Sequence, residues 1–213
     1  MAKPLTLLFD LGGVIMDIER SRAVDALRAL GMAGADDFLG DYAQKGPFLA
    51  LERGDITPGE FRDEVRRLLP AGVTDAQIDA AFLRFLVGIP VRRLRALEEL
   101  HRSHKLYMLS NTNPIMWDTA IADEFRKDGR SMGYYFDGWV ASFAVHAYKP
   151  DAAIFRKAVE MFSLEPENTL FLDDSKANCL AAEALGFRTA WVRPGTEFTD
   201  YIPGYVSESG GNV

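Results

Sequence analysis

The chain opens with an apolar run at residues 5–10, LTLLFD, which ends in an acid and is followed by two glycines. A short run without alternation is typical of a strand buried on both faces of a parallel sheet. Over residues 16–88 the apolar positions change to spacings of three and four, with breaks at Gly, Pro and Asp. This pattern predicts four or five short amphipathic helices with no strand between them.

Within that block, the helix that begins inside ITPGEF, residues 56–61, has the clearest start. Thr57 is the expected N-cap, and Pro58 takes the first helical position, where its missing N–H costs nothing. The other helical patterns lie in residues 19–31, 46–57 and 74–88.

From residue 90 the pattern alternates between helix-like and strand-like segments. We predict helices in residues 91–103, 114–125, 151–163 and 176–186, and strands in residues 105–111, 138–142, 168–174 and 188–192. Repeated units of this length indicate a parallel sheet with helices on both faces. The predicted fold class is therefore α/β. A Rossmann-like core comprises residues 1–15 and 89–213, and a small all-helical cap, residues 16–88, is inserted after the first strand. The tail at residues 207–213 is expected to fray.

Composition narrows the functional classes. The 213 residues carry a net charge of −7, so no basic surface for nucleic acid is expected. No window approaches the roughly 18 consecutive apolar residues of a membrane span. The single cysteine, Cys179, allows no internal disulfide, and together with the absence of a leader-like start this indicates a cytoplasmic protein. We expect a monomer or a homodimer.

Polar residues follow the predicted strands at or shortly after their carboxyl ends, which is where open parallel sheets bind ligands. Each has an ordinary alternative as a turn former, helix cap or solvated charge. Their shared placement at one sheet edge favours a functional site. These residues are Asp10 after the first strand, Ser110 and Asn111 in LSNTN, Lys149 in HAYKPD, and Asp173 with Asp174 in FLDDS.

The chemistry that this set allows is specific. Three carboxylates close together repel one another and need a cation, and oxygen ligands without clustered Cys or His indicate Mg²⁺. A glycine-rich turn that includes Gly13 lets backbone N–H groups approach an anion. A serine hydroxyl, an amide and a lysine can hold the oxygens of a phosphate. One carboxylate is then available as a nucleophile that forms an acyl-phosphate, which water hydrolyses.

The chain resembles the haloacid dehalogenase-like (HAD) superfamily of aspartate-based phosphohydrolases. The resemblance is carried by four motifs in this order, FDLGGV, LSNTN, YKPD and FLDDS, and by the helical insert after the first of them. The resemblance covers essentially the whole chain and implies a hydrolase that uses Mg²⁺ and acts on a small phosphorylated metabolite. It also implies residue roles: Asp10 as nucleophile and metal ligand, Ser110 and Asn111 as phosphate-binding residues, Lys149 as the catalytic lysine, Asp173 and Asp174 as metal-binding acids with Asp174 the direct ligand, and the Gly12 carbonyl as a further metal ligand.

The sequence departs from most phosphatases of the superfamily at Gly12, where they carry a second Asp as general acid and base. Such assistance is typically worth ~10²–10⁴-fold in rate. The sequence resembles one branch that carries the same glycine, the bacterial glucose-1-phosphate phosphatase type. The shared segments are FDLGGVIMDIE, LERGDIT, LSNTN and FLDDSKAN. A sugar's anomeric oxygen is a good leaving group, so its ester depends less on an acid. Asp17, Glu19 or Glu52 could replace the missing acid. Glu52 and Arg53 lie in the predicted cap and are expected to contact substrate.

Three functions are compatible with these residues. The first is a Mg²⁺-dependent phosphatase that acts through an aspartyl-phosphate on Asp10, with a sugar phosphate as one candidate substrate. The second is a 2-haloacid dehalogenase, which uses the same Asp but needs no metal and hence no paired acids such as Asp173 and Asp174. The third is a catalytically weak HAD-fold protein with a binding or regulatory role, against which the retained Asp10 and Lys149 argue.

Overall fold

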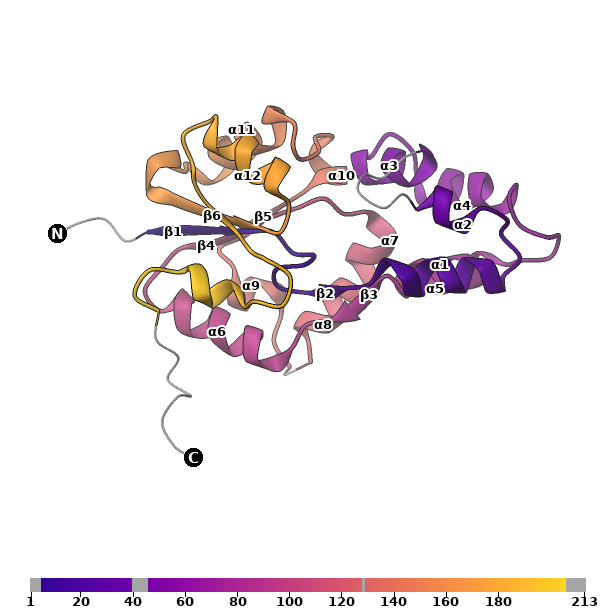
Figure 1. Ribbon diagram of the computed structural model, residues 1–213, viewed down its shortest axis with the longest axis horizontal. Coiled ribbons are helices and arrows are strands. Elements are labelled where there is room, and N and C mark those ends of the chain that lie inside the picture. Colours follow the sequence, from indigo (N-terminus) through magenta and orange to yellow (C-terminus); the bar gives the residue numbers. More distant parts are fainter. Residues whose placement is uncertain (1–4, 40–45, 128, 206–213) are drawn as a thin grey trace.

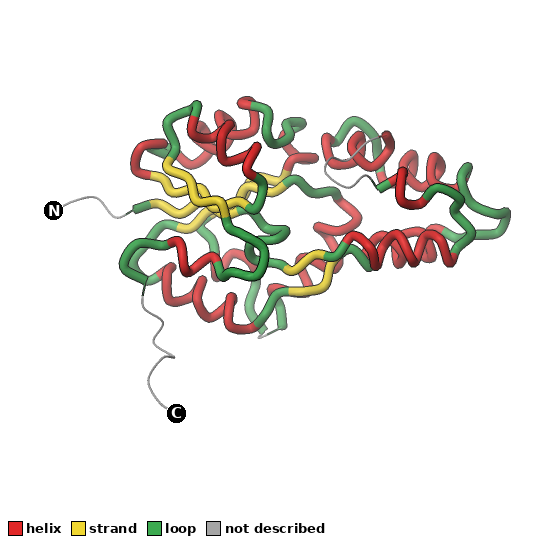
Figure 2. The backbone as a smooth tube through the Cα atoms, in the orientation of Figure 1, coloured by secondary structure: helices red, strands yellow, loops and turns green. Residues whose placement is uncertain are grey.

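A five-stranded parallel sheet forms the centre of the larger lobe in the computed structural model, which describes residues 5–39, 46–127 and 129–205 (Figure 1, Figure 2). Its strand order is β5–β4–β1–β6–β7, and every neighbouring pair is parallel. The strands are β1 (Thr6–Phe9), β4 (Leu106–Ser110), β5 (Gly138–Ala141), β6 (Thr169–Asp173) and β7 (Arg188–Trp191). The predicted parallel α/β core is confirmed.

Both faces of the sheet are covered by helices, as the apolar run of β1 predicts. Leu7 and Phe9 point to one face and Leu8 to the other, because successive side chains of a strand alternate. The helices on the Leu8 face are α11 (Ala152–Phe162) and α12 (Lys176–Glu183). Those on the Leu7 and Phe9 face are α6 (Val91–His101), α9 (Met132–Tyr135) and the 3₁₀ helix Phe198–Tyr201 (Figure 1).

A second, helical lobe lies beyond the carboxyl ends of the strands (Figure 1). It contains α1 (Arg20–Ala29), α2 (Ala35–Phe38), α3 (Gly46–Arg53), α4 (Pro58–Arg66) and α5 (Asp75–Leu83). Phe48, Phe61 and Phe82 pack their rings together at its centre. Thr57 and Glu60 form a reciprocal capping box at the start of α4, which confirms the predicted N-cap and first turn.

The helix predicted for residues 74–88 is too long. α5 ends at Leu83, and β3 (Leu86–Gly88) then pairs antiparallel with β2 (Asp17–Ile18). Gly88 has a φ of +135°, which no helix contains. The two segments that connect the lobes, which we call the lobe crossings, contain β2 and β3 and thus satisfy part of their backbone hydrogen bonding by pairing with each other. We keep the division into a core (residues 1–15 and 89–213) and a cap (residues 16–88) as a proposal, with β2 and β3 near its boundaries.

Several short elements differ from the sequence prediction. The segment predicted as one helix over residues 114–125 is α7 (Pro114–Met116), a π-helical turn (Trp117–Ile121) and α8 (Ala122–Phe125). Elements of three or four residues are too short to produce a recognisable periodicity, and the prediction omitted α9, α10 (Ser142–Val145) and two 3₁₀ turns, Pro166–Asn168 and Phe198–Tyr201. The predicted fraying at residues 207–213 lies outside the described residues.

Candidate active site

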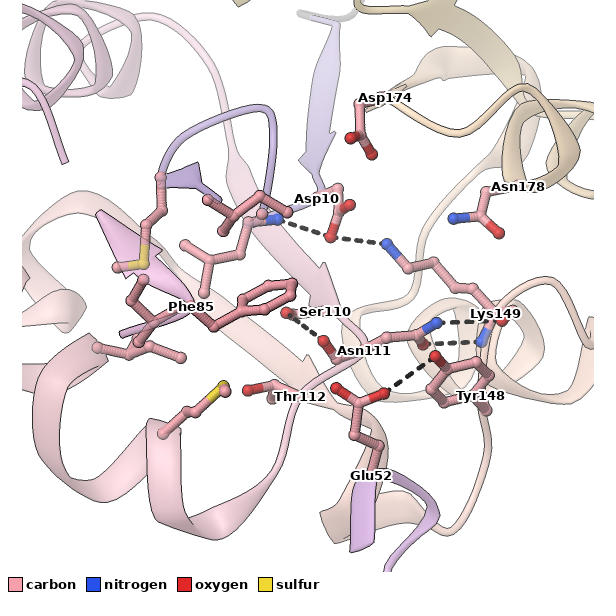
Figure 3. Close-up of a pocket in the computed structure, with 17 residues that line it drawn as sticks. Asp10, Glu52, Phe85, Ser110, Asn111, Thr112, Tyr148, Lys149, Asp174 and Asn178 are labelled. Carbon is pink, nitrogen blue, oxygen red and sulfur yellow. Dashed lines mark hydrogen bonds and ion pairs between the residues drawn. The ribbon is translucent and has the colours of Figure 1, made fainter. Parts of the chain in front are cut away.

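A buried lysine joins two of the predicted acids at the carboxyl edge of the sheet. Lys149 Nζ lies 2.7 Å from Asp10 Oδ1 (Figure 3) and 2.7 Å from Asp173 Oδ2, and the lysine side chain is only 1% exposed. Burial alone would lower the pKa of Lys149, but the charges of Asp10 and Asp173 raise it. The lysine is therefore an ammonium ion that holds both carboxylates. The convergence predicted from the strand ends is present.

Asp10 is held in one orientation by its neighbours. Its Oδ1 atom accepts a hydrogen bond from the Leu11 N–H at 2.7 Å as well as the contact from Lys149. Burial raises the pKa of Asp10 well above its usual range; Lys149 opposes this shift, and the charges of Asp173 and Asp174 add to it. One ammonium does not compensate three neighbouring carboxylates, so the cluster calls for further positive charge.

The acid cluster has the composition of a site for a hard divalent cation. Asp10, Asp173 and Asp174 each present an oxygen, and these atoms lie within 4.8 Å of one another. Loss of hydration and the charge of Asp173 raise the pKa of Asp174 to about 6, although the residue as a whole is exposed. Carboxylate oxygens grouped in this way fit Mg²⁺. The charge of a bound ion would keep these carboxylates ionised.

The two acids of FLDDS, Asp173 and Asp174, differ in their surroundings. Asp173 Oδ2 faces Lys149, and its Oδ1 accepts hydrogen bonds from the Ser175 N–H at 2.8 Å and Asn178 Nδ2 at 2.9 Å. The Asp174 carboxylate is bonded by its own backbone N–H rather than by a neighbouring side chain of the described residues, and it lines the pocket. Asp174 is thus the acid with oxygens to spare, which supports the prediction that it is the direct ligand.

The two glycines of the first motif have different surroundings. Gly13 has a φ of +75°, and a Cβ there would lie 2.2 Å from Asp174 Oδ2, so only glycine lets the turn approach this carboxylate. The Gly13 N–H donates to the Met16 carbonyl at 2.9 Å, so this amide is not directed at a phosphate. Gly12 lines the pocket, and a Cβ there would make an ordinary 3.4 Å contact with Ile18 Cδ1.

Ser110 and Asn111 both line the pocket but have different partners. Ser110 is 2% exposed and donates only a long hydrogen bond, 3.4 Å, to the Asn111 carbonyl. The Asn111 side chain binds the backbone of Lys149 twice: its Nδ2 donates to the Lys149 carbonyl at 3.0 Å, and its Oδ1 accepts from the Lys149 N–H at 2.8 Å. Asn111 therefore fixes the position of the lysine, a contact that the sequence prediction did not include.

The cap contributes one acid to the pocket. Glu52, at the end of α3, is 6% exposed and accepts a hydrogen bond from the Tyr148 hydroxyl at 3.0 Å (Figure 3). Burial is the largest cause that raises the pKa of Glu52, to about 7. Arg53 points elsewhere: it pairs with Asp151 of the core at 3.3 Å and does not line the pocket.

Apart from Thr112 of LSNTN, the remaining lining of the pocket was not predicted from the sequence. The cavity, about 170 Å³, has an apolar wall on the side of the lobe crossings, where Phe85 is the largest side chain. Tyr148 could have been suspected because it directly precedes Lys149; Phe85 carries no sequence signal, since only the fold places it here. The full lining comprises Asp10, Leu11, Gly12, Met16, Ile18, Glu52, Phe85, Leu86, Ser110, Asn111, Thr112, Met116, Ile121, Tyr148, Lys149, Asp174 and Asn178.

The family follows from comparison with known proteins. Residues 5–186 match the model of the haloacid dehalogenase-like hydrolases, and the chain belongs to this family. A D-ribitol-5-phosphate phosphatase of Bacteroides thetaiotaomicron is 35% identical over 192 residues, which cover 90% of this chain and 93% of the relative.

Solved structures agree with the fold. An alanine mutant of a HAD-family enzyme from Bacteroides thetaiotaomicron, in complex with magnesium and inorganic phosphate, is 34% identical, with a TM-score of 0.90 over 93% of this chain and 98% of the other. A HAD-like hydrolase from Porphyromonas gingivalis is 34% identical with a TM-score of 0.86, covering 94% and 96% of the two chains. The chain is a hydrolase of the phosphoric monoester type. None of the described helices is long and apolar enough to span a bilayer.

Proposed function

We propose that this protein hydrolyses the phosphate monoester of a small polyol or sugar, with Asp10 as the nucleophile and Mg²⁺ as the cofactor. The observation that carries the proposal is the position of Lys149 Nζ, 2.7 Å from both Asp10 and Asp173, beside a third acid that faces the pocket. Asp10, Asp174 and the Gly12 carbonyl would hold the ion, with Asp173 supporting them. The ion would offset negative charge on the transferring phosphoryl group.

The side chains of the pocket have distinct roles in the proposed reaction. Asp10, oriented by the Leu11 N–H and Lys149, attacks phosphorus and forms an aspartyl-phosphate as the ester oxygen leaves. Lys149 offsets charge on the nucleophile and on the phosphoryl oxygens. Ser110, whose hydroxyl is only weakly engaged, would bind a phosphoryl oxygen, and Asn111 would act mainly by fixing Lys149. Water then attacks phosphorus and regenerates the Asp10 carboxylate.

The substrate class rests on the size of the site and on the relatives. A cavity of about 170 Å³, closed on one side by the cap residue Glu52, suits a small metabolite rather than a polymer. A relative with 35% identity over 90% of this chain is a D-ribitol-5-phosphate phosphatase, which supports a polyol or sugar phosphate here. A cytoplasmic setting, consistent with the unpaired and buried Cys179, and a monomeric or homodimeric state belong to the same proposal.

A panel of phosphate esters tests this proposal. Polyol 5-phosphates, sugar 1-phosphates and para-nitrophenyl phosphate are assayed for phosphate release with Mg²⁺ and with a chelator, beside Asp10→Asn. We expect turnover that requires Mg²⁺ and is abolished in D10N. Release of halide from a 2-haloacid without metal would indicate the dehalogenase instead. If wild-type protein neither turns over any ester nor binds Mg²⁺ or inorganic phosphate, the proposal is wrong and a binding or regulatory role is favoured.

A further inference from the structure

The pocket lacks an acid at the position next to the nucleophile. Gly12 has no side chain, so no group in that turn can deliver a proton to the leaving oxygen. The need is greatest for an alkyl ester such as a polyol 5-phosphate, because an alkoxide is a poor leaving group. An enzyme with the substrate class proposed above therefore requires a proton donor from another part of the fold.

Two of the three acids considered from the sequence are used elsewhere. Asp17 forms an ion pair with the buried Arg93 at 2.7 Å, and Glu19 accepts a hydrogen bond from Ser21 at 2.8 Å. Neither residue lines the pocket of Asp10. The acids that do line it are Asp10 and Asp174 at the sheet edge and Glu52 from the cap. Since the first two belong to the nucleophile and the metal site, Glu52 is the acid left for proton transfer.

The position of Glu52 suits that task. Figure 3 shows its side chain entering the pocket from α3 on the side opposite Asp10, so that a substrate between them has its phosphorus near Asp10 and its leaving oxygen toward Glu52. The Ser142 hydroxyl donates to the Glu52 backbone carbonyl at 2.6 Å, which fixes the end of α3 against the core. A close approach of Gly54 to the core maintains the same contact: a Cβ there would lie 2.3 Å from the Phe143 carbonyl oxygen.

The surroundings of Glu52 keep it protonatable near neutral pH. Burial raises its pKa to about 7, and the hydrogen bond from Tyr148 and the charge of Lys149 oppose the shift. Tyr148 is itself half-buried, and its own pKa is raised by burial and by Glu52, so it stays a hydroxyl donor. The facing groups are thus one phenol and one ammonium, both from the core. A group with a pKa near the working pH is best suited to both donate and accept a proton.

We propose that Glu52 is the general acid and base of this enzyme, replacing the side chain that Gly12 lacks. This inference rests on the proposed phosphatase function. In the first half-reaction an Asp10 oxygen bonds to phosphorus, the bond from phosphorus to the ester oxygen breaks, and the Glu52 carboxyl gives its proton to that oxygen. In the second, water attacks phosphorus, its proton passes to the Glu52 carboxylate, the bond to Asp10 breaks, and phosphate leaves.

The test compares two esters in wild type and Glu52→Gln. The readout is kcat/KM, which covers the steps through formation of the phospho-enzyme. A polyol 5-phosphate needs a protonated leaving group, whereas para-nitrophenyl phosphate releases a stable anion. We expect E52Q to lose about 10²-fold in kcat/KM on the polyol ester and to keep its value on the nitrophenyl ester. The fall of wild-type kcat/KM above about pH 7, where Glu52 loses its proton, should disappear in E52Q. Glu64→Gln, an exposed substitution on the same cap, should change neither kcat/KM on the two esters nor its pH dependence.

The possible outcomes distinguish a failure of the acid–base role of Glu52 from a failure of the proposed phosphatase function. Equal losses on both esters, or a raised KM with unchanged kcat on the polyol ester, would show that Glu52 only binds substrate and would overturn the acid–base role while the phosphatase stands. An unchanged pH profile in E52Q would overturn it as well. If wild type hydrolyses neither ester, the proposed function itself fails. Circular dichroism of E52Q confirms that the fold is retained.

Discussion

Lys149 Nζ contacts Asp10 Oδ1 at 2.7 Å in a place where the lysine side chain is almost wholly buried. The same ammonium holds Asp173. Removing it by Lys149→Met leaves two buried carboxylates without their partner, a change that typically costs about 3–5 kcal/mol. We predict a loss of that order in the free energy of unfolding by urea, and a loss of at least about 10²-fold in kcat because charge stabilisation is removed.

Lys105→Met is the matched control for that loss. Lys105 also pairs with an acid, Asp137, at 2.6 Å, but its side chain is 68% exposed. Exposed ion pairs contribute little to stability because water screens them, and Lys105 lies outside the pocket. K105M should therefore keep its activity and nearly all of its stability. Equal effects of the two substitutions would contradict the role given to Lys149.

Substitutions of Asp174 and Asp173, the two acids of FLDDS, should separate metal binding from structural support. Asp174→Asn removes a ligand that has oxygens to spare, so Mg²⁺ affinity measured by calorimetry should fall about 10²-fold or more. The metal-free protein should be as stable as wild type or more so, because a repulsive charge beside Asp173 is gone.

Asp173→Asn should behave in the opposite way. It disturbs the contacts with Lys149, Ser175 and Asn178, so the metal-free protein should lose about 2–3 kcal/mol of stability. Greater destabilisation in D174N than in D173N would show that the two acids have been assigned the wrong way round.

Gly13→Ala should damage the metal site through sterics alone. Its Cβ would lie 2.2 Å from Asp174 Oδ2, so the carboxylate must move. Gly195→Ala provides the control, because its φ of +81° is equally unfavourable for alanine and no atom lies within 4 Å of the new Cβ. Both variants should lose about 1 kcal/mol from backbone strain, but only G13A should lose Mg²⁺ affinity in calorimetry. Retained affinity in G13A would contradict the close packing of Gly13 on Asp174.

Glu52 should make stability fall as pH rises. Its pKa is raised from an ordinary 4.5 to about 7, so between these values the folded state binds more protons than the unfolded state. Raising pH through this window costs stability, and Glu52→Gln removes the cost. We predict E52Q to match wild type near pH 4 and to exceed it by up to about 3 kcal/mol near pH 8. Urea unfolding of both proteins measures this, and a difference that does not vary with pH would contradict the burial of an ionisable carboxyl.

Local patterns along the chain predicted the sheet and the acids at its edge. Asp10 and Asp173 each end a buried apolar strand, and parallel strands bring such ends together whatever the details of the helices. The capping box at Thr57 was predictable for the same reason, since its signal lies within four residues.

The contacts between the lobes were not predictable in this way. The pairing of β2 with β3 joins segments about seventy residues apart, and strands of two and three residues are too short to show a periodic pattern. The orientation of the cap relative to the core places Glu52 in the pocket and Arg53 beside Asp151. Two adjacent residues of one helix thus have different roles, and the Ser142 hydroxyl, which donates to the Glu52 carbonyl, fixes the end of that helix against the core.

The central claim, that Asp10 carries the phosphoryl group, is tested most directly by acid-quenching the enzyme during turnover of para-nitrophenyl phosphate with Mg²⁺ and mapping the peptides by mass spectrometry. The account predicts a phosphoryl group on the peptide that contains Asp10, removed by hydroxylamine as an acyl-phosphate is, and absent from Asp10→Asn. Turnover without phosphoryl on Asp10, or a D10N variant that keeps wild-type activity, would contradict it.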